Sequence, residues 1–596
     1  MSQKIVRIGC SSGFWGDSAI AAPQLVHGGD IHYLVADYLA EITMSIMARA
    51  RAKDPGAGFA TDFVTVTMKR LLRDIAARGI RVVTNAGGVN PTACAEAIRA
   101  MAAEQGLALR VAAVLGDDLM AQAEELRRAG IAEMSSGAPL PESLMSMNAY
   151  LGAIPIAQAL AAGADIVITG RCVDSALVLG PLMHEFGWRA DDFDRLAAGS
   201  LAGHIIECGA QCTGGLFTDW DQVPGWENIG YPVIECAADG SFIVTKPPGT
   251  GGLVTRGTVA EQLLYEIGDP AAYILPDVIC DFTAVTIEQV GENRVRVAGA
   301  RGLPPTTSYK VCATYMDGWR MSAQLTIGGI DAPAKARRTA EAVLARTRAM
   351  FRRMNLADYR ETHIETLGAE AMYGPHSRAL GTREVVLRLA ASHAERLPLE
   401  IMGRELISSG TSMSPGTTGG GGGRARAQPV VRLYSCLVPK ERVAIHVEMD
   451  GASRPVAVPP GAGPRAGAPV QAAAADTPPA PTPEPRRFVP LVRLAWGRSG
   501  DKGNDSNIGI IARQPQFLPL IREQVTAERV RDFMAHAVKG EVRRFDLPGI
   551  GAVNFLLRDA LGGGGIASLR NDPQGKAFAQ MLLDLPVEVP VSLLGD

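Results

Sequence analysis

Four polar or glycine-rich segments follow short apolar runs in the first third of the chain. They are Gly9–Asp17, Asn85–Pro91, Gly116–Asp118 and Gly170–Ser175. Free backbone N–H groups in such segments can hold a carboxylate or polarise a thioester carbonyl. Aspartate supplies a general acid or base, and arginine neutralises an anionic substrate group. These residue types therefore indicate chemistry on a carboxylate or an acyl group.

Candidate site residues come from these segments and from later polar motifs. The expected acids and bases are Asp17, Asp37, Asp174 and His204. The expected substrate-binding residues are Gly13, Gly16, Asn85, Gly87, Gly88, Asn90, Arg171, Lys246, Arg498, Asp501 and Lys502. For Gly13, Gly87 and Gly88, a role in forming tight turns is the equal alternative. For His204, beside Glu207, a structural role is favoured over that of a polarised base. For Cys172, a buried thiol is favoured over a nucleophile.

A helix is expected to begin near Asp30, because Asp30, Leu34, Asp37 and Glu41 recur at spacings of three and four. It would carry three carboxylates on one face, where their repulsion calls for water, a cation or a partner chain. The alternatives are a solvated acidic face and the wall of an active site. No metal ligand is assigned, and a divalent metal among these carboxylates is left open.

Apolar strand patterns alternate with helical ones from Ile5 to about Asp281, which predicts a buried parallel sheet. In such a sheet the loops after the strands lie along one edge, where ligands bind. The four polar segments are therefore expected to meet there. The chain has no GxGxxG fingerprint and no GxxxxGK[ST] loop, so NAD, FAD and ATP lack support.

The predicted fold class is α/β: a large N-terminal domain with a mostly parallel, Rossmann-like sheet plus an α+β portion, and a small ferredoxin-like α+β domain. The expected boundaries are 1–281 for the sheet, 282–453 for the α+β portion, 454–487 for a disordered Pro/Ala linker and 488–596 for the last domain. The glycine-rich segment 408–426 either closes over an anion or is a floppy loop. A Gly-rich turn over 496–507 is expected to form an anion or interface site, or to pair its Asp with its own Lys.

Composition narrows the function class. Hydrophobic residues make up 47% and charged residues 20%, and the net charge is −3, which argues against nucleic acid and anionic membranes as partners. No apolar run reaches the roughly 18 residues of a membrane span, and the N-terminus lacks a secretory pattern. The nine cysteines form no CxxC pair, so reduced thiols in the cytoplasm are expected.

Several motifs resemble the acyclic terpene utilisation protein A family. They include GFWGDS (13–18), NAGGVNP (85–91), TGRCVDSAL (169–177), ECGAQCTGG (207–215), TKPPGTGG (245–252) and GRSGDKGNDSNIG (497–509). The resemblance covers nearly the whole chain except the linker. It implies a large N-terminal domain, a ferredoxin-like C-terminal domain, and a place in the breakdown of citronellol and geraniol, whose intermediates are branched acyl-CoA thioesters.

Two functions follow from these observations. The first is an enzyme, a lyase or hydrolase of branched acyl-CoA thioesters or carboxylates. It would take acyl-CoA as a small-molecule substrate rather than as a bound cofactor, and it would form a homo-oligomer. The second is a non-catalytic assembly or carrier module that organises pathway enzymes through the ferredoxin-like domain. The density of Gly, Asp, Asn and Arg at strand ends favours the enzyme.

Overall fold

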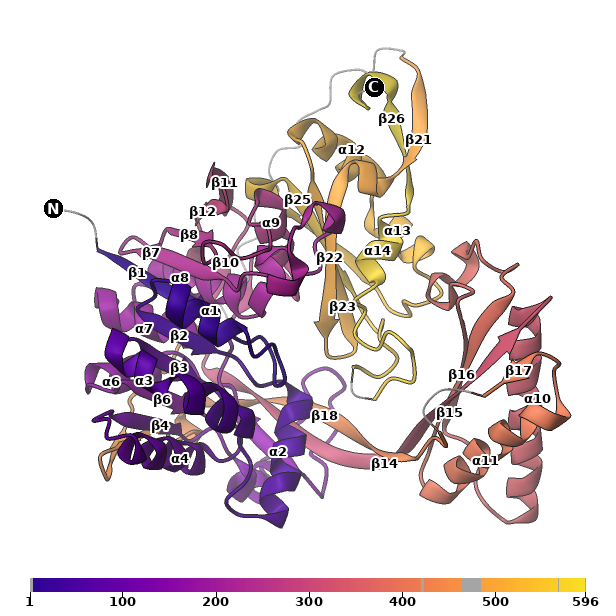
Figure 1. The fold of residues 1–596 in the computed structure, drawn as a ribbon, viewed down its shortest axis with the longest axis horizontal. Helices are drawn as coiled ribbons and strands as arrows, with labels where there is room; N and C mark the ends of the chain where they lie inside the picture. Colours follow the sequence, from indigo (N-terminus) through magenta and orange to yellow (C-terminus); the bar gives the residue numbers. More distant parts are fainter. Residues whose placement is uncertain (1–3, 420–422, 463–483, 566, 595–596) are drawn as a thin grey trace.

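The chain forms three lobes in the computed structural model, which describes residues 4–419, 423–462, 484–565 and 567–594 (Figure 1). A large lobe contains the main sheet, and a long strand pair leads from it to a small lobe. The C-terminal domain stands against the large lobe and also reaches the small one. Within the described residues no helix is long and apolar enough to cross a membrane.

The main sheet is mixed, with a parallel centre. The parallel strands run in the order β1 (Ile5–Cys10), β2 (Tyr33–Ala36), β3 (Arg81–Thr84), β6 (Ile166–Thr169) and β4 (Val111–Leu115). Antiparallel strands extend both sides: β7 (Val233–Ala237), β8 (Phe242–Thr245), β12 (Arg294–Ala298) and β11 (Thr286–Gly291) beyond β1, and β19 (His446–Met449) and β20 (Ala452–Pro455) beyond β4. The prediction of a mostly parallel sheet is wrong, because hairpin-connected strands outside the α/β repeat add to both edges. The sheet also continues past the boundary expected at residue 281.

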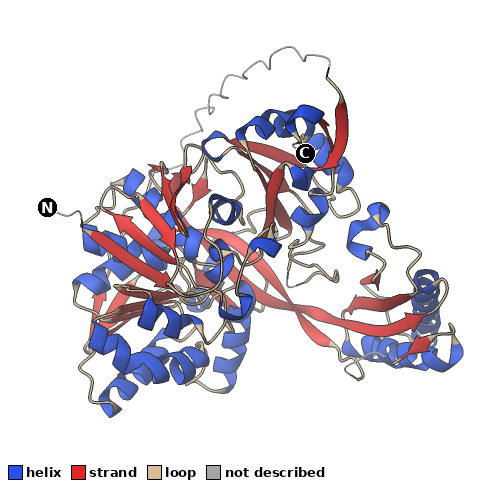
Figure 2. Ribbon diagram, turned by 45° about the horizontal axis from the view of Figure 1, so that its top comes forward, coloured by secondary structure: helices blue, strands red, loops and turns tan. Residues whose placement is uncertain are grey.

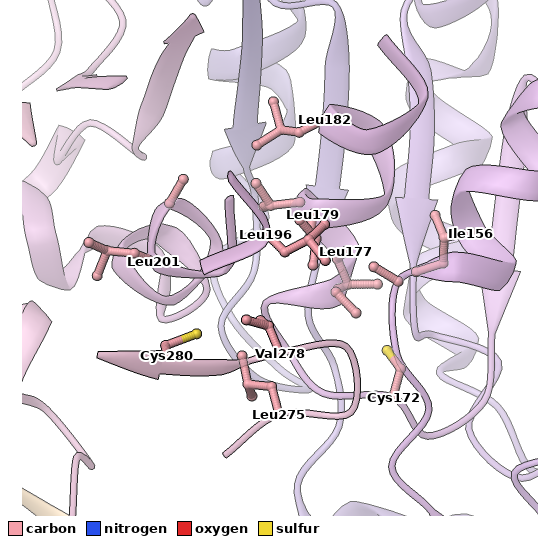
Figure 3. Packing of buried hydrophobic residues seen from close by; sticks show 14 of the residues in the cluster. Ile156, Cys172, Leu177, Leu179, Leu182, Leu196, Leu201, Leu275, Val278 and Cys280 are labelled. Carbon is pink, nitrogen blue, oxygen red and sulfur yellow. The ribbon is translucent and has the colours of Figure 1, made fainter. Parts of the chain in front are cut away.

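Helices cover both faces of this sheet and enclose one apolar cluster on each. On one face lie α1 (Ala21–Gly28), α2 (Glu41–Lys53), α3 (Lys69–Arg78) and α4 (Pro91–Glu104). On the other lie α6 (Ile154–Ala161), α7 (Ala176–Phe186), α8 (Phe193–Ile206) and α9 (Arg256–Leu264), with α5 (Ala123–Arg128) beside them. Figure 3 shows part of the second cluster, with Ile156, Leu177 and Leu179 among its buried side chains in front of the strands. These layers fix the strand ends and the loops that follow them.

The expected helix beginning near Asp30 is wrong. Residues Tyr33–Ala36 form the strand β2, which is buried on both sides, and α2 begins only at Glu41. The apolar run of the strand fits a central parallel position, where both faces are covered. Asp30 therefore precedes the strand, with a side chain 87% exposed and bonded to Arg7, while Asp37 follows it at the opposite edge. The three carboxylates share no helical face, which removes the reason to expect a metal among them.

A single long strand, β14 (Ser308–Gly328), joins the large and small lobes (Figure 2). It pairs with β18 (Gln428–Pro439), β5 (Ser146–Ala149), β16 (Glu384–His393) and β17 (Thr417–Thr418), and β15 (Glu361–Leu367) completes this sheet. The helices α10 (Ala332–Arg353) and α11 (Arg396–Ser412) cover it in the small lobe. A shift of register between Met316 and Trp319 lets one strand serve both lobes. Of the glycine-rich segment, residues 420–422 lie outside the described residues.

The C-terminal domain holds a four-stranded antiparallel sheet in the order β22 (Ala495–Lys502), β23 (Asp505–Ala512), β25 (Ala552–Leu557) and β24 (Val542–Leu547). Beside it lie the strand pair β21 (Arg486–Pro490) and β26 (Pro586–Pro590) and the helices α12 (Leu518–Gln524), α13 (Ala527–Phe533) and α14 (Phe578–Leu582). The turn expected over 496–507 is wrong, since only Gly503 and Asn504 separate the two strands. Of the expected linker, residues 463–483 lie outside the described residues.

Polar residues inside these strands dock the domain on the large lobe. The Asn507 side-chain amide donates to the carbonyl of Leu264 (2.7 Å), and its oxygen accepts the N–H of Glu266 (3.0 Å). The Asn554 amide donates to the carbonyls of Ile267 (2.8 Å) and Gly268 (2.7 Å). Both asparagines are fully buried. They bond backbone groups that have no partner within α9 at its C-terminal end. The face of the C-terminal sheet is polar here because the backbone after α9 covers it.

We expect Asn554→Ala to lower the free energy of unfolding by about 1–3 kcal/mol, because two carbonyls would lose their donors inside a buried interface. Urea unfolding followed by circular dichroism measures the change. The exposed Asn571 in the same domain supplies the control variant Asn571→Ala, expected within about 0.5 kcal/mol of the wild type. Equal losses in the two variants would contradict this account of the interface.

Candidate functional site

The carboxyl ends of the parallel strands meet at one edge of the main sheet, here called the rim. Asp37 follows β2 there, and its backbone exchanges hydrogen bonds with Ser12 after β1 (2.8 and 2.9 Å). The Asp37 Oδ1 atom accepts the Asn85 amide (2.6 Å) and the N–H of Leu39 (3.0 Å). Asn85 follows β3 and is fully buried. Two sequence-distant residues are thus locked to each other at the rim.

The environment of Asp37 favours its protonated form. Burial raises its pKa to about 6, although the Asn85 amide, the Leu39 N–H and the charge of Arg171 act in the opposite direction. The Glu207 carboxylate raises it further. None of the described residues donates to its second oxygen, Oδ2. Asp37 is therefore a fixed carboxyl that can take up or release a proton near neutral pH.

Arg171 supplies a buried cation beside this carboxyl. It follows β6, and its backbone N–H donates to Oδ2 of Asp117 (2.8 Å) at the end of β4. Its Nη1 atom donates to the carbonyl of Leu39 (2.6 Å), and its guanidinium carbon lies 4.2 Å from the centre of the Tyr150 ring. Asp117 also accepts the Asn148 amide, and burial raises the pKa of Asp117 to about 7. Asp117 positions Arg171 through the backbone.

A second layer of charge surrounds Arg171. The Tyr150 hydroxyl donates to Glu41 (2.6 Å), and the Nζ of Lys310 lies 5.0 Å from the Tyr150 ring centre. Burial alone would raise the pKa of Glu41, but Arg171, Lys310 and the Tyr150 hydroxyl outweigh it and hold this pKa at about 2. Glu41 is thus a permanent anion that offsets the buried cation.

Asp174 and Glu207 border the open side of the cluster. Asp174 Oδ1 lies 3.5 Å from Nη1 of Arg171, and the Asp174 side chain keeps 37% of its surface exposed. Burial and the nearby Asp37 carboxylate raise the pKa of Asp174, while Arg171 lowers it. Glu207 Oε1 lies 2.9 Å from Nδ1 of His204, whose Nε2 lies 3.1 Å from the carbonyl of Leu263. Both His204 nitrogens face acceptors, so the ring is held in place with no nitrogen free for a substrate.

The recess beside Arg171 is narrow. Glu41, Tyr150, Arg171 and Cys312 contribute to its lining, and its volume of about 10 Å³ has room for about one water molecule. A larger cavity of about 260 Å³ lies between the small lobe and the C-terminal domain, beside Arg378 and other residues outside the rim. The rim nevertheless carries the clustered titratable groups, so we place the site there. A substrate would approach it from the side of Asp174.

Other predicted residues hold loops rather than face this cluster. Asp17 Oδ2 accepts the N–H of Gly13 (2.9 Å), and its Oδ1 accepts the Tyr231 hydroxyl (2.5 Å). The Gly13 N–H is therefore occupied within its own loop. A Cβ at Gly13 would lie 2.7 Å from the carbonyl carbon of Cys208, so close packing requires a glycine there. Gly16 has a φ of 106° and lies exposed in this loop.

The segment after β3 is likewise structural beyond Asn85. Gly87 and Gly88 are buried, and a Cβ at Gly88 would lie 2.7 Å from the carbonyl oxygen of Gly58. The Asn90 side chain caps α4 and donates to the carbonyl of Ala57 (2.8 Å). Lys246 donates to the carbonyl of Thr250 (2.7 Å) within its own loop. None of these groups bonds a member of the Asp37–Arg171 cluster among the residues the structure describes.

Cys172 lies beside Arg171 in sequence but points into the apolar core. Its side chain is 1% exposed, and Figure 3 shows it in the cluster with Leu177 and Ile156. Burial raises the pKa of the Cys172 thiol, which opposes the formation of a thiolate. All nine cysteines are free, and the described part of the chain holds no group of three or more metal-ligating side chains in a suitable arrangement. The buried-thiol interpretation of Cys172 therefore holds.

The three predicted residues of the last domain lie at its contact with the large lobe. Arg498 is buried in β22 and donates to the side-chain oxygen of Gln211 (2.6 Å) and the carbonyl of Leu216 (3.2 Å). Asp501 pairs with Lys576 (3.2 Å) rather than with Lys502. Lys502 is exposed at the hairpin end.

Comparison with known families shows to which family the chain belongs. Residues 6–449 match the family model described as acyclic terpene utilisation family protein AtuA. The chain belongs to this family. Residues 489–588 match the AtuA ferredoxin-like domain, which agrees with the antiparallel sheet of the last domain. Comparison with curated proteins gives no significant match, and neither does comparison with solved structures.

Sequence reasoning missed several members of the candidate site at the rim. Tyr150 and Lys310 are far from the polar motifs in sequence and reach Arg171 only through the pairing of β5 with β14. In the sequence, Glu207 stands out only as a neighbour of His204. Asp117 stands in one of the segments singled out above, and its place directly after an apolar strand was the available signal. Long-range strand pairing supplied the remaining members.

We expect Glu41→Gln to destabilise the protein by about 1–3 kcal/mol at pH 7. The folded pKa of Glu41 lies below the ordinary 4.5, so its ionised form stabilises the fold above about pH 4.5, and this contribution is lost as the pH falls through about 2. Urea unfolding at a series of pH values should show a constant gap from pH 7 to 5 that narrows below pH 4.5. Glu124→Gln, on a residue 64% exposed, is the control. A difference in the free energy of unfolding that does not change with pH would contradict the role of Glu41 as a permanent anion.

Proposed function

We propose that this AtuA family member is an enzyme of acyclic terpene breakdown, a lyase or hydrolase acting on branched acyl-CoA thioesters or carboxylates. One observation carries the proposal: Asp37, with a pKa raised to about 6, is fixed by Asn85 beside the buried Arg171. A carboxyl with a perturbed pKa next to a fixed cation is typical of catalytic sites. Family membership supports the role in acyclic terpene breakdown, and the groups at the rim support the acid–base chemistry.

Each group takes a role that its surroundings support. Asp37, ionised above about pH 6, acts as the general base toward a substrate proton or a water molecule. Arg171 neutralises negative charge on the substrate carboxylate or on the thioester oxygen in the transition state. Asp174, at the exposed side of Arg171, exchanges the proton with solvent. Asn85 and Asp117 position Asp37 and Arg171 respectively.

The alternative, a module that organises other enzymes through the ferredoxin-like domain, has less support. The sheet face that a partner would use is covered by the loop after α9 of the same chain. Clustered carboxyls around a buried arginine also serve no evident purpose in a scaffold. A cytoplasmic location and a homo-oligomeric state stay predictions.

We expect Asp37→Asn to lower kcat/KM for a branched acyl-CoA substrate by about 10²–10⁴-fold, since the amide cannot accept the proton. In the wild type, kcat/KM should fall as the pH drops below about 6, because protonation of Asp37 removes the base. Release of free thiol detects hydrolysis of a panel of isohexenylglutaryl-type and related CoA thioesters, and mass spectrometry of the acids and of the remaining CoA thioesters detects cleavage by a lyase. The panel also includes free branched carboxylates.

The matched control is Asp30→Asn, which changes an exposed aspartate at the far edge of the sheet. It should keep wild-type kinetics. If the wild type neither binds nor converts any member of the panel, the enzyme proposal is wrong. Turnover that survives intact in Asp37→Asn would remove Asp37 from the catalytic role.

A further inference from the structure

The hairpin end of the C-terminal domain brings a lysine to the rim. The Nζ of Lys502 lies 5.7 Å from the centre of the Tyr273 ring, in the short strand β9 (Tyr273–Ile274). The Tyr273 ring lies 5.7 Å from the ring of His204, the partner of Glu207. A chain of contacts thus connects the last domain with the border of the carboxylate cluster. In Figure 1 the strands β22 and β23 lie between the large lobe and the small lobe.

The hairpin is held in this place by close contacts. A Cβ at Gly500 would lie 2.6 Å from the Tyr265 ring, and a Cβ at Gly509 would lie 2.5 Å from Cβ of Leu264. Only glycine permits this approach of the strands to the end of α9. The Arg498 guanidinium lies 4.8 Å from the centre of the same Tyr265 ring. The position of Lys502 is therefore set by a packed interface rather than by a free loop.

Among the described residues Lys502 lacks the ion-pair partner that its neighbours Asp501 and Lys576 have. Asp501 pairs with Lys576, whose Nζ also lies 3.4 Å from Glu266. By contrast, over the described ranges no carboxylate oxygen lies within 4.0 Å of the Lys502 Nζ, and its side chain is exposed. An exposed ammonium held against an aromatic ring at the border of a site is ready to bind an anion.

We propose that the C-terminal domain completes the substrate site, and that Lys502 binds a second anionic group of a substrate whose reacting acyl end lies at Arg171. This inference rests on the proposed function and specifies its substrate as dianionic or more highly charged. A second carboxylate and a phosphate of coenzyme A share the chemistry that Lys502 recognises. The ferredoxin-like domain thereby determines substrate specificity in cis.

Binding to the full chain tests this assignment. The variant Lys502→Gln and the control Lys539→Gln, at an exposed lysine of the same domain, are titrated by calorimetry. The probes are citronellate as a monocarboxylate, 3-methylglutarate as a dicarboxylate and 3-methylglutaryl-CoA. We expect Lys502→Gln to weaken binding of at least one multiply charged probe by about 10-fold and of citronellate by less than about twofold.

The two charged probes distinguish the source of the second anion. A loss for 3-methylglutarate assigns Lys502 to a carboxylate, and a loss confined to the thioester assigns it to the coenzyme A phosphates. An equal loss for citronellate, an equal effect of Lys539→Gln, or no loss for either charged probe would overturn the inference.

A second readout does not depend on turnover. Lysine acetylation of the wild-type chain is followed by mass spectrometry with and without inorganic pyrophosphate or 3-methylglutarate. We expect one of these anions to slow modification of Lys502 several-fold and to leave Lys539 unchanged. Protection by neither anion overturns the inference, even where thioesters are converted. Protection without conversion of any thioester or carboxylate of the panel instead contradicts the proposed enzyme alone.

Discussion

The buried guanidinium of Arg171 is the constraint on which the rim depends. Removing such a cation from water costs several kcal/mol unless hydrogen bonds and opposite charges compensate. Here the Leu39 carbonyl, the Tyr150 ring and the carboxylates of Glu41 and Asp174 supply that compensation. These groups come from three separate segments: the one that joins β2 to α2, the end of β5 and the loop after β6. The fold of the rim therefore places hydrogen-bond acceptors and negative charges around the guanidinium of Arg171.

More carboxyl groups surround Arg171 than one positive charge can neutralise. The additional carboxyl groups supply the chemistry of the rim. Asp37 also interacts electrostatically with Arg171, and the Glu207 carboxylate acts on both Asp37 and Asp174. Glu41 is the best paired, and its pKa falls to about 2, while that of the more deeply buried Asp37 rises to about 6. Similar side chains thus separate into a permanent anion and a proton carrier. Their different environments set this division.

How much of this arrangement the sequence predicts depends on how local each signal is. The apolar runs that directly precede polar segments indicate the parallel strands, such as Arg81–Thr84, and this local pattern places Asn85 and Arg171 at one edge. The strand β2 was mistaken for a helix because it has only four residues and its flanking carboxylates happen to recur with helical spacing. Tyr150 and Lys310 could not be found, since strand pairing across more than 150 residues brings them together.

The last domain shows the same limit in another form. Residues 496–507 resemble a turn because glycine and polar residues dominate, yet they form a hairpin whose polar strands match the unpaired backbone at the end of α9. A strand is polar when its neighbour is a backbone rather than an apolar face.

This docking also alters the charge around the rim. The inner cluster is rich in carboxylates and would repel an anionic substrate, so cations at its border must offset the repulsion. Lys310 provides one such cation from β14, and Lys502 can provide the other only while the C-terminal domain stays docked.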